Sequence, residues 1–365
     1  MRQYLILINL LFLLVFTTGL RAGETNGPPI VRTHIPTLAE AIRFQGEITL
    51  CGDKILYNQA EVRERLEKEM MLSVWNRPQV LLWLKRANRY FPHIERILKE
   101  EGLPSDLKYV PIVESALRPH SRSGKGAVGY WQFLKGTGKK YGLRINDRID
   151  ERRSLFKSTR AASLYLKKLN KEFGSFLLAL AAYNMGEFGL NREIEAQGTR
   201  DFFSLYLPLE TQRYVLKIVA AKLIMTSPES YGFNLTPADL YPLFAYSEIK
   251  FSLNSEIPLT MIAQAADISF KTLKDHNPDI RGYYLAKGKN VILVPKGKEK
   301  GFKPKFEALH KSWNENNTIR FHVVKPGESL TGIAAQHNMS LSALLRLNKF
   351  SYKKVIHPGD RLLVQ

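Results

Sequence analysis

The sequence predicts an α+β protein: a mainly α-helical domain followed by two copies of a small strand–helix–helix–strand (βααβ) module. Three observations predict this class. Apolar residues recur at helical spacing from about residue 80 to residue 226. The pattern of residues 259–293 then recurs 71 positions later, as expected for a repeated module. The composition, 44% hydrophobic and 11% aromatic over 365 residues, suffices for several packed cores.

The first residues of the chain have the layout of an export signal. MRQYLILINLLFLLVFTTGL has a short basic start, an apolar run from Tyr4 to Phe16 and then small residues. We predict a signal peptide over residues 1–22, with an uncleaved anchor as the alternative. The apolar run is short for a membrane span, so membrane association is expected only through this segment if it is retained. Residues 23–75 are assigned to an N-terminal extension of unstated role.

Charge and cysteine content restrict the partners and the compartment. The net charge of +20 implies an anionic partner, namely nucleic acid, lipid headgroups or a carboxylate-bearing cell-wall polymer, unless the basic residues serve only solubility. Export makes nucleic acid the least favoured, and no basic helix has base-reading spacing, so we expect no nucleic-acid partner. The single Cys51 excludes an internal disulfide. We therefore expect an exported protein of the bacterial periplasm or cell envelope.

The helical domain is assigned to residues 76–226. Gly102 and Pro104 supply a helix stop followed by a new start. Pro111 should kink or restart the second helix one turn before Glu114. The predicted helices, in chain order, are 80–101, 104–117, 158–172, 175–185 and 210–226.

Glu114 lies on an apolar helix face. Its spacing from Leu107, Val110 and Leu117 places the carboxylate toward the core. Burial against apolar side chains raises the pKa of a carboxyl group toward neutrality, as a general acid requires. A structural glutamate paired with a buried Arg or Lys is an equal alternative. The other acids of this region lie in polar loops and are expected at the surface or in caps: Asp147, Asp150 and Glu151.

A glycine-rich segment, residues 118–129, follows Glu114 and would let the backbone approach a bound molecule. Gln132, between two aromatic residues, needs hydrogen-bond partners if it is buried, and a substrate could be one of them. The aromatic side chains next to it offer faces for stacking on sugars, although packing in the core is the more frequent role: Tyr130, Trp131 and Phe133.

Two later helices carry polar residues at their ends. The helix over 175–185 is apolar on nearly every side, so it should cross the core, yet it ends with Tyr183 and Asn184. These residues could line a cleft, or Tyr183 could simply pack while Asn184 caps the helix. Glu210 and Tyr214 open the last helix, and either could be architectural.

The repeated modules are assigned to residues 241–297 and 320–365, with the basic stretch 298–319 as a linker. The match between copies is gapless from residue 259 onward. Ser269 and Ser340 should cap the second helix of each copy. Alternation then predicts a closing strand with Val291 and Leu293 on one face in the first copy, and Leu362 and Val364 in the second. A leading strand is visible at 320–324 of the second copy.

With these residues identified, the helical domain resembles the soluble lytic transglycosylase domain of the goose-type lysozyme superfamily, in particular the membrane-bound lytic murein transglycosylase D type. Four ordered motifs carry the resemblance: ES at 114–115, GAVGYWQF at 126–133, AAYN at 181–184 and ETQRY at 210–214. The chain departs from the family pattern at Tyr130, at 134–135 and at Leu216. The resemblance implies a lysozyme-like fold with Glu114 as the catalytic residue. It implies that substrate is bound by Ser115, Gly129, Trp131, Gln132, Tyr183, Asn184 and Tyr214.

The repeats resemble LysM modules, which bind glycans that contain N-acetylglucosamine. The first copy is degenerate because it lacks the Pro-Gly-Glu-Ser turn. In the second copy the resemblance implies a shallow glycan groove made by two segments: Gly327, Glu328, Ser329 and Leu330 in one, and Ile356, His357 and Pro358 in the other.

The resemblance also implies the reaction and its substrate. Glycoside hydrolysis normally needs two carboxylates, whereas only Glu114 stands out here. One acid suffices if the N-acetylmuramic acid of a peptidoglycan strand closes its own 6-hydroxyl onto C1 and leaves a 1,6-anhydro end. A hydrolytic muramidase and a non-catalytic wall-binding protein are the alternatives. No His or Cys spacing typical of a metal site occurs, so we expect no metal or cofactor.

Overall fold

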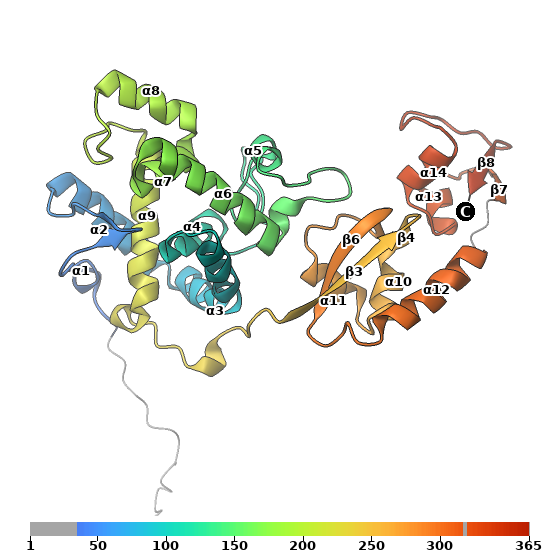
Figure 1. The fold of residues 1–365 in the computed structure, drawn as a ribbon, viewed down its shortest axis with the longest axis horizontal. Coiled ribbons are helices and arrows are strands. Elements are labelled where there is room, and N and C mark those ends of the chain that lie inside the picture. The colour runs from blue at the N-terminus through green and yellow to red at the C-terminus, as the bar shows by residue number, and fades with distance from the viewer. Residues whose placement is uncertain (1–34, 317–319, 365) are drawn as a thin grey trace, which may run out of the picture. The chain divides into compact units, whose positions relative to one another are not determined.

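The structure, a computed structural model, describes residues 35–316 and 320–364. The predicted signal peptide, residues 1–22, lies outside this part of the chain. Helices dominate up to about residue 240, and short helices alternate with small antiparallel sheets beyond it (Figure 1). The α+β class is therefore confirmed. Within the described residues, every helix is too short or too polar to cross a membrane.

The helical domain contains all of the helices predicted from the sequence, together with further elements that were not predicted. Its α-helices are α1 (Leu38–Ala41), α2 (Ala60–Trp75), α3 (Arg77–Glu100), α4 (Val110–Ser115), α5 (Lys135–Lys140), α6 (Leu155–Phe173), α7 (Phe176–Met185), α8 (Glu187–Gln197) and α9 (Leu209–Thr226). Its 3₁₀ helices are η1 (Ser105–Tyr109), η2 (Glu151–Arg153), η3 (Pro228–Tyr231) and η4 (Pro237–Asp239). A small hairpin joins β1 (Thr49–Leu50) to β2 (Asp53–Lys54).

Local sequence sets the ends of the helices that form the core. Ser154 and Ser175 cap α6 and α7 by accepting hydrogen bonds from backbone N–H groups of the first turn. Gly174 ends α6 with φ +78°, a conformation that glycine adopts without strain. The middle of α7 is buried all round, as its apolar sequence predicts, so α7 crosses the core.

Residues before the predicted start of the helical domain contribute to the same core. Val62, Leu66, Met70 and Val74 of α2 are buried at helical spacing. They belong to one hydrophobic cluster with residues of α4, α7 and α9, and α2 packs directly against α9. Helix α2 is therefore a structural part of the domain that carries Glu114.

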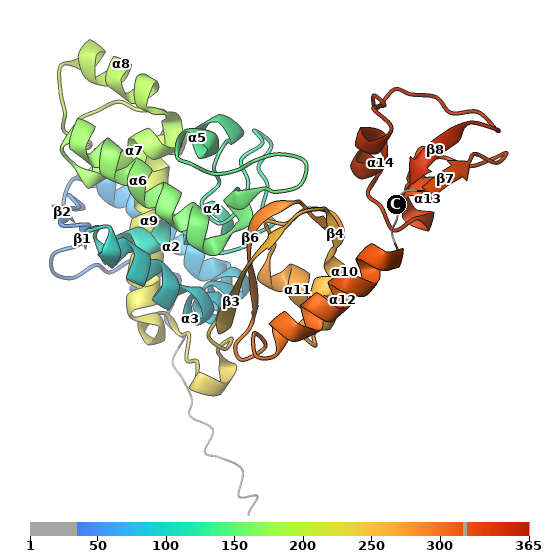
Figure 2. The same ribbon diagram turned by 45° about the vertical axis from the view of Figure 1, so that its right-hand side comes forward.

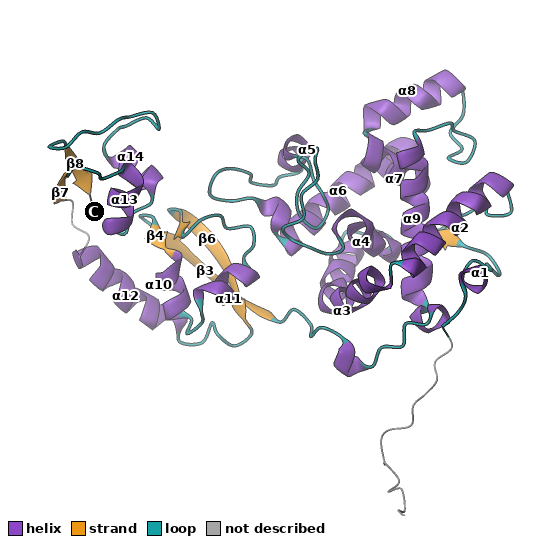
Figure 3. Cartoon of the chain, turned by 180° about the vertical axis from the view of Figure 1, so that it is seen from behind, coloured by secondary structure: helices purple, strands orange, loops and turns teal. Residues whose placement is uncertain are grey.

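Both repeats have the predicted strand–helix–helix–strand order (Figure 3). In the first module β3 (Tyr246–Leu253) pairs with β6 (Gly288–Pro295), and β4 (Ile257–Pro258) pairs with β5 (Tyr284–Leu285). Its helices are α10 (Leu259–Ala265) and α11 (Phe270–His276). The second module consists of β7 (Arg320–Val323), α13 (Leu330–Gln336), α14 (Leu341–Leu347) and β8 (Arg361–Val364), with β7 and β8 paired. Ser269 and Ser340 cap α11 and α14 as predicted.

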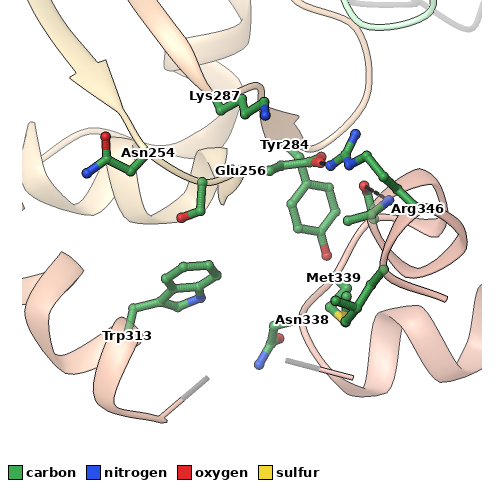
Figure 4. A pocket seen from close by; sticks show the side chains of 12 residues that line it. Asn254, Glu256, Tyr284, Lys287, Trp313, Asn338, Met339 and Arg346 are labelled. Atoms are coloured by element: carbon green, nitrogen blue, oxygen red, sulfur yellow. Dashed lines mark hydrogen bonds and ion pairs between the residues drawn. The ribbon is translucent and has the colours of Figure 1, made fainter. Parts of the chain in front are cut away.

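The basic stretch assigned as a linker is instead a helix, α12 (Phe302–Asn316), that lies along α10 (Figure 2). The prediction was wrong because Phe302 and Phe306, one helical turn apart, are buried in the core of the first module. The basic residues between them face outward, so a high content of Lys hid an amphipathic helix. Figure 4 labels Trp313 of α12 together with Glu256 and Tyr284 of the same module.

One asparagine closes each module in the same way. Asn277 donates to the carbonyls of Leu273 and Leu293 and accepts from the N–H of Leu293, over 2.7–2.8 Å. Asn348 makes the same three bonds to Leu344 and Leu363, over 2.7–2.9 Å. Each asparagine thus joins the second helix to the closing strand.

This equivalence corrects the gapless repeat predicted for the closing strand. Leu293 corresponds to Leu363, which is a separation of 70 residues and not 71. In β6 the buried apolar residues are therefore Ile292 and Val294, whereas Val291 is 48% exposed. A shift of one residue moves every side chain of a strand to its other face. In the second module Leu362 and Val364 are buried, as predicted.

Candidate active site

Glu114 lies in the last turn of α4, a helix of six residues. The helix restarts after η1 with Pro111 in its first turn, where the missing N–H costs nothing, so the predicted break before Glu114 is confirmed. It ends abruptly because Ala116 and Leu117 both adopt left-handed backbone, with φ +52° and +58°. Non-glycine residues rarely occupy this region. The strained turn holds Glu114 at the end of the helix.

Two arginines and a serine fix this turn. Arg86 donates to the carbonyl oxygen of Ala116 over 3.0 Å, and Arg118 donates to that of Ser115 over 3.1 Å. The hydroxyl of Ser115 is buried and lies 2.8 Å from the carbonyl oxygen of Tyr130 and 3.1 Å from that of Pro111. Ser115 therefore ties α4 to the following loop, and this position does not suit the substrate contact predicted for it.

Glu114 is a partly exposed residue, and its carboxyl group accepts a hydrogen bond from the buried Tyr214 hydroxyl over 2.7 Å. Burial raises the pKa of Glu114 to about 7, and the hydrogen bond from Tyr214 opposes this rise. Glu114 takes part in none of the ion pairs found among residues 35–316 and 320–364. The alternative of a structural glutamate paired with a cation is therefore wrong, and the group is close to half protonated at neutral pH.

Two further charges act on Glu114 from α9. The carboxylate of Glu210, which is exposed in the first turn of that helix, raises the pKa of Glu114. Lys217, one turn beyond Tyr214, lowers it by a smaller amount. Helix α9 thus places a hydroxyl donor, a carboxylate and a cation near the Glu114 carboxyl group.

The glycine-rich loop after α4 is folded back on itself around Gly129 and Gln132. Gly129 has φ +87°, and a Cβ atom there would lie 1.9 Å from the carbonyl oxygen of Arg152, so only glycine fits. Gln132 also has positive φ, +47°. Its side-chain amide donates to the carbonyls of Gly129 and Ser121 over 2.8 and 3.1 Å, which satisfies the N–H groups and fixes the direction of the amide.

The aromatic residues of this loop pack in the core, which is the more frequent role considered for them, and do not offer the faces for sugar stacking that were considered beside it. Trp131 is completely buried and donates its indole N–H to Thr159 over 2.9 Å. Tyr130 and Phe133 are also buried. Large apolar rings after a tight loop gain more from the core than from water, which is the alternative that the sequence left open. Trp131 thus anchors the loop in the core and offers no exposed face to a ligand.

Tyr183 and Asn184 connect α7 to this loop and to α9. The Tyr183 hydroxyl donates to the carbonyl oxygen of Trp131 over 2.7 Å. Burial, and then the charge of Glu114, raises the pKa of Tyr183 well above its usual value, so the ring lies near the acid. The side-chain oxygen of Asn184 accepts from buried Thr211 over 3.0 Å. Both residues are partly exposed at the end of the core helix.

The acids of the polar loop occupy a different environment from the predicted one. Asp147 is exposed as expected, but Asp150 and Glu151 are buried. Asp150 pairs with Arg152 at 2.8 Å, and Glu151 pairs with Arg144 and Lys157 at 2.7 and 2.9 Å. These bonds hold the pKa of both carboxyl groups below the usual range, because they offset the effect of burial. Neither acid can serve as a proton donor near neutral pH.

In the second module the two predicted groove segments lie together. The backbone N–H of Gly359 donates to the carbonyl oxygen of Val324, and that of Val324 donates to Asp360, so the chain before Gly327 adjoins the chain after Pro358. Ser329 caps α13, and Glu328 accepts from the N–H of Lys325 over 2.8 Å. Ile356 packs on the core of the module. The other residues of the two segments face solvent to different degrees: Gly327, Ser329, His357 and Pro358 are exposed, and Glu328 and Leu330 are partly exposed.

Several residues of the site were not predicted from the sequence. The side chains of Arg86 and Arg118 donate to backbone carbonyls, and no motif marks such contacts. Thr211 lies within the ETQRY motif, which was the available signal. Lys217 follows Tyr214 at helical spacing on α9, so the two fall on one face.

Comparisons with known proteins match three parts of the chain. The transglycosylase SLT domain matches residues 91–205, the LysM domain matches residues 322–365, and the LysM-like domain of lytic transglycosylase MltD matches residues 250–311. This last match extends into α12 and so agrees with the packing of that helix on the first module. The resemblance derived from the four motifs and from the repeats is confirmed.

Individual proteins are similar over different lengths. The chain is 34% identical over 293 residues to membrane-bound lytic murein transglycosylase D of Escherichia coli (strain K12), covering 76% of this chain and 64% of that protein. It is 38% identical over 102 residues to the peptidoglycan transglycosylase gp16 of Escherichia phage T7, covering 27% of this chain and 8% of that protein. The solved structure of lytic transglycosylase Slt from Pseudomonas aeruginosa is 23% identical with a TM-score of 0.33, covering 41% of this chain and 26% of that chain. The chain thus spans less than two thirds of the curated relative.

Proposed function

We propose that this chain, which carries a transglycosylase SLT domain and two LysM-type domains, is a peptidoglycan lytic transglycosylase. It cleaves the β-1,4 bond between N-acetylmuramic acid and N-acetylglucosamine and leaves a 1,6-anhydro end. The supporting observation is the state of Glu114, which is partly exposed, bonded to Tyr214 and raised in pKa to about 7. Such a group donates and accepts protons readily at neutral pH.

In the proposed reaction, protonated Glu114 donates its proton to the glycosidic oxygen, and the bond from that oxygen to C1 of N-acetylmuramic acid breaks. The 6-hydroxyl oxygen of the same sugar then bonds to C1, and its proton passes to the Glu114 carboxylate. The enzyme regains its starting state and no water is consumed. Proton transfer by a positioned acid contributes about 10² to 10⁴ in rate.

The surrounding residues hold the acid and the sugars in place. Tyr214 orients the Glu114 carboxyl group through its hydrogen bond. Asn184 and Gln132, both partly exposed, are proposed to contact the acetamido groups, with Tyr183 beside them. Ser115, Gly129 and Trp131 position α4 and the loop, and we assign them no contact with the substrate.

A hydrolytic muramidase is the second candidate, and Glu210 is the observation that favours it. Hydrolysis requires a second carboxylate to activate water or attack the sugar. Glu210 is exposed and its charge acts on Glu114, so it could fill this role. A non-catalytic wall protein would have no need of the acid and of the tyrosine and amide groups assembled around it.

Product analysis separates the candidates. Purified sacculi would be digested with the full chain and the muropeptides analysed by mass spectrometry. A lytic transglycosylase gives anhydro ends, lighter than reducing ends by one water. Reducing ends that disappear in Glu210→Gln would support the hydrolase, and an absence of products would support the wall protein.

The modules and the charge fit the same substrate. The exposed turn of the second module is proposed to bind N-acetylglucosamine-containing glycan, and the basic surface to favour an anionic wall polymer. We propose export to the periplasm or cell envelope, with membrane association only through the N-terminal segment if it is retained. Binding of isolated sacculi by the full chain, and its loss when residues 327–330 are replaced by the corresponding residues of the first module, would test the role of the turn.

A further inference from the structure

Three titratable side chains of the second module form a chain of hydrogen bonds at the turn over residues 327–330. His322 of β7 is buried, and its Nε2 lies 2.7 Å from a carboxylate oxygen of Glu328 in the turn. On the other side of the ring, Nδ1 of His322 lies 3.0 Å from Nε2 of His337, the residue that follows α13. The same oxygen of Glu328 also accepts from the N–H of Lys325 over 2.8 Å. The cluster thus joins β7, the turn and the end of α13.

The bonds of this cluster define the proton on each ring. A carboxylate only accepts, so Nε2 of His322 carries a proton and donates it to Glu328. In a neutral ring the other nitrogen accepts, so Nε2 of His337 donates to Nδ1 of His322. Glu328 stays ionised, because the N–H of Lys325 and then the bond from His322 hold the pKa of its carboxyl group below the usual range.

This arrangement accommodates one further proton but not two. One further proton leaves both bonds in place, because either ring can be the cation while a single proton lies between the two rings. With two further protons, both facing nitrogens carry N–H groups, so two donors and two positive charges meet across 3.0 Å. The contact between His322 and His337 then breaks. Histidine ordinarily changes its charge between about pH 8 and pH 5, so mild acidification leads toward this state.

The titration of the two rings is set by the cluster itself. Successive residues of a strand point to opposite faces, so the charged neighbours of β7 divide between two sides of the module. The other charged side chains on the surrounding elements face solvent or other partners: Lys325 and Arg346 are exposed, Arg361 lies over the ring of Phe321 on the other face of β7, and Asp360 accepts from the N–H of His357.

The first module, which lacks the turn, has apolar residues at the three equivalent positions. The equivalents follow from strand pairing for His322 and from the 71-residue repeat for the other two, and they are Ile249, Ile257 and Ala266. Ala266 follows α10 as His337 follows α13. All three are buried. A module of this type therefore folds without ionisable groups at these positions, and the cluster accompanies the turn.

We infer that His322 and His337 position the turn of the second module and make its binding of glycan depend on pH, a role that rests on the glycan binding proposed above for this turn. While the two rings share at most one further proton, the cluster holds the turn between β7 and α13 in its binding form. Once both rings are protonated, the bond from β7 to the end of α13 is lost and the turn is no longer held on both sides. Glycan binding therefore weakens as the pH falls.

The first test measures binding by titration calorimetry. The full chain with Glu114→Gln, which prevents cleavage, would be titrated at about pH 7.5 and about pH 5 with an N-acetylglucosamine hexamer, a ligand without titratable groups. We expect the affinity to fall about tenfold at the lower pH, roughly the loss of one polar contact. In the additional variant His337→Gln, which keeps an N–H donor and cannot bind the second proton, the affinity should be equal at both values. No fall in the parent, or the same fall in His337→Gln, would overturn the inference.

Two controls accompany this measurement. His120→Gln removes an exposed histidine of the helical domain and should keep the tenfold fall, whereas its disappearance in this variant would place the pH dependence outside the cluster and overturn the inference. The chain in which residues 327–330 are replaced by those of the first module gives the binding by the rest of the protein, which is subtracted.

The second test observes the rings and the turn by NMR. In the full chain labelled with ¹⁵N, the ring nitrogens report which of them carries a proton, and the signals lost in His322→Phe and in His337→Gln assign the two rings. We expect His322 and His337 to titrate in two separate steps, with the backbone amides of residues 327–330 moving in the second step. Independent titration of the rings, with the turn unmoved, would overturn the inference. If the hexamer binds at neither pH, the glycan role proposed for the turn fails, and this titration still decides whether the cluster moves the turn.

Discussion

Glu114 and the pair Asp150 and Glu151 lie in one domain, and burial acts on the pKa of all three, yet their chemistry differs. Burial raises the pKa of Glu114 to about 7, because only a neutral hydroxyl bonds to it. For Asp150 and Glu151 burial has the same sign, but hydrogen bonds and charges from arginine and lysine outweigh it and lower the pKa. Burial alone therefore does not determine the pKa of a carboxyl group. The charge of the groups bonded to it determines whether its pKa is raised or lowered.

The two regions also divide the work of the site. Arg152, which pairs with Asp150, donates in addition to the carbonyls of Gly126 and Phe133 over 3.1 Å. The paired acids thus fix the loop that carries Gln132, while the unpaired acid is left available for proton transfer. Four predictions test this contrast between the acids.

The largest effect is expected at the unpaired acid. Glu114→Gln removes the group that gives one proton and takes up the other in the proposed mechanism, so kcat on peptidoglycan should fall by about 10³ or more. The fold should be retained, because a neutral amide replaces a carboxyl group that is already half neutral at pH 7. Activity assays on sacculi, with circular dichroism as the control for folding, would check this. Undiminished turnover would remove Glu114 from the mechanism.

The second effect concerns the paired acid. Asp150→Asn leaves the buried guanidinium of Arg152 without its counter-charge, which costs about 3 kcal/mol of stability at neutral pH. Chemical denaturation would measure it, and Asp147→Asn, at an exposed position of the same loop, is the matched control with an expected change near zero. A loss as small as that of the control would mean that the pair does not hold the loop.

The third effect is the pH dependence of stability at the unpaired acid. The pKa of Glu114 is about 7 in the folded state and near 4.5 in the unfolded state, so ionisation destabilises the fold and this cost grows as pH rises from 4.5 through 7. Glu114→Gln should therefore be more stable than the wild type by about 3 kcal/mol at pH 8, and the difference should vanish near pH 4. Denaturation of both proteins across this range would check it. A constant difference would contradict the raised pKa.

The smallest effect is expected at the neutral partner. Tyr214→Phe removes a hydrogen bond that favours the ionised acid, so the pKa of Glu114 should rise further and the alkaline limb of the pH–rate profile should move to higher pH. The loss of the bond costs about 1 kcal/mol of stability. Tyr206→Phe, at an exposed tyrosine, is the control. A limb that moves to lower pH would show that Tyr214 acts differently.

The sequence allowed the central acid to be predicted because its signal is local. Helical spacing placed Glu114 on an apolar face, and the four motifs identified its neighbours. The role of each neighbour could not be predicted. An aromatic residue after a loop looks the same in the sequence whether it stacks on a sugar or packs in the core. Trp131 fills the core because the loop turns back at Gly129 against the backbone of Arg152. This contact joins residues more than twenty positions apart.

The remaining errors have similar causes. Asp150 and Glu151 were expected at the surface because polar neighbours surround them in sequence, whereas the fold brings cations and apolar side chains over them. The helix α12 was hidden by its Lys content, although Phe302 and Phe306 at a separation of four were a sign of an amphipathic helix. The shift of one residue in β6 could not be seen from residue identities, since valine, isoleucine and leucine alternate without a break there.

The asparagine bonds shared by the two modules have a consequence for how such units change. Asn277 and Asn348 fasten helix to strand with the same three contacts, although the turn that is proposed to recognise sugar exists in one copy and is missing in the other. The bonds that join helix to strand are therefore independent of the turn proposed to recognise sugar. A unit of this kind can lose, exchange or regain its specificity at the turn while the asparagine bonds keep the second helix attached to the closing strand.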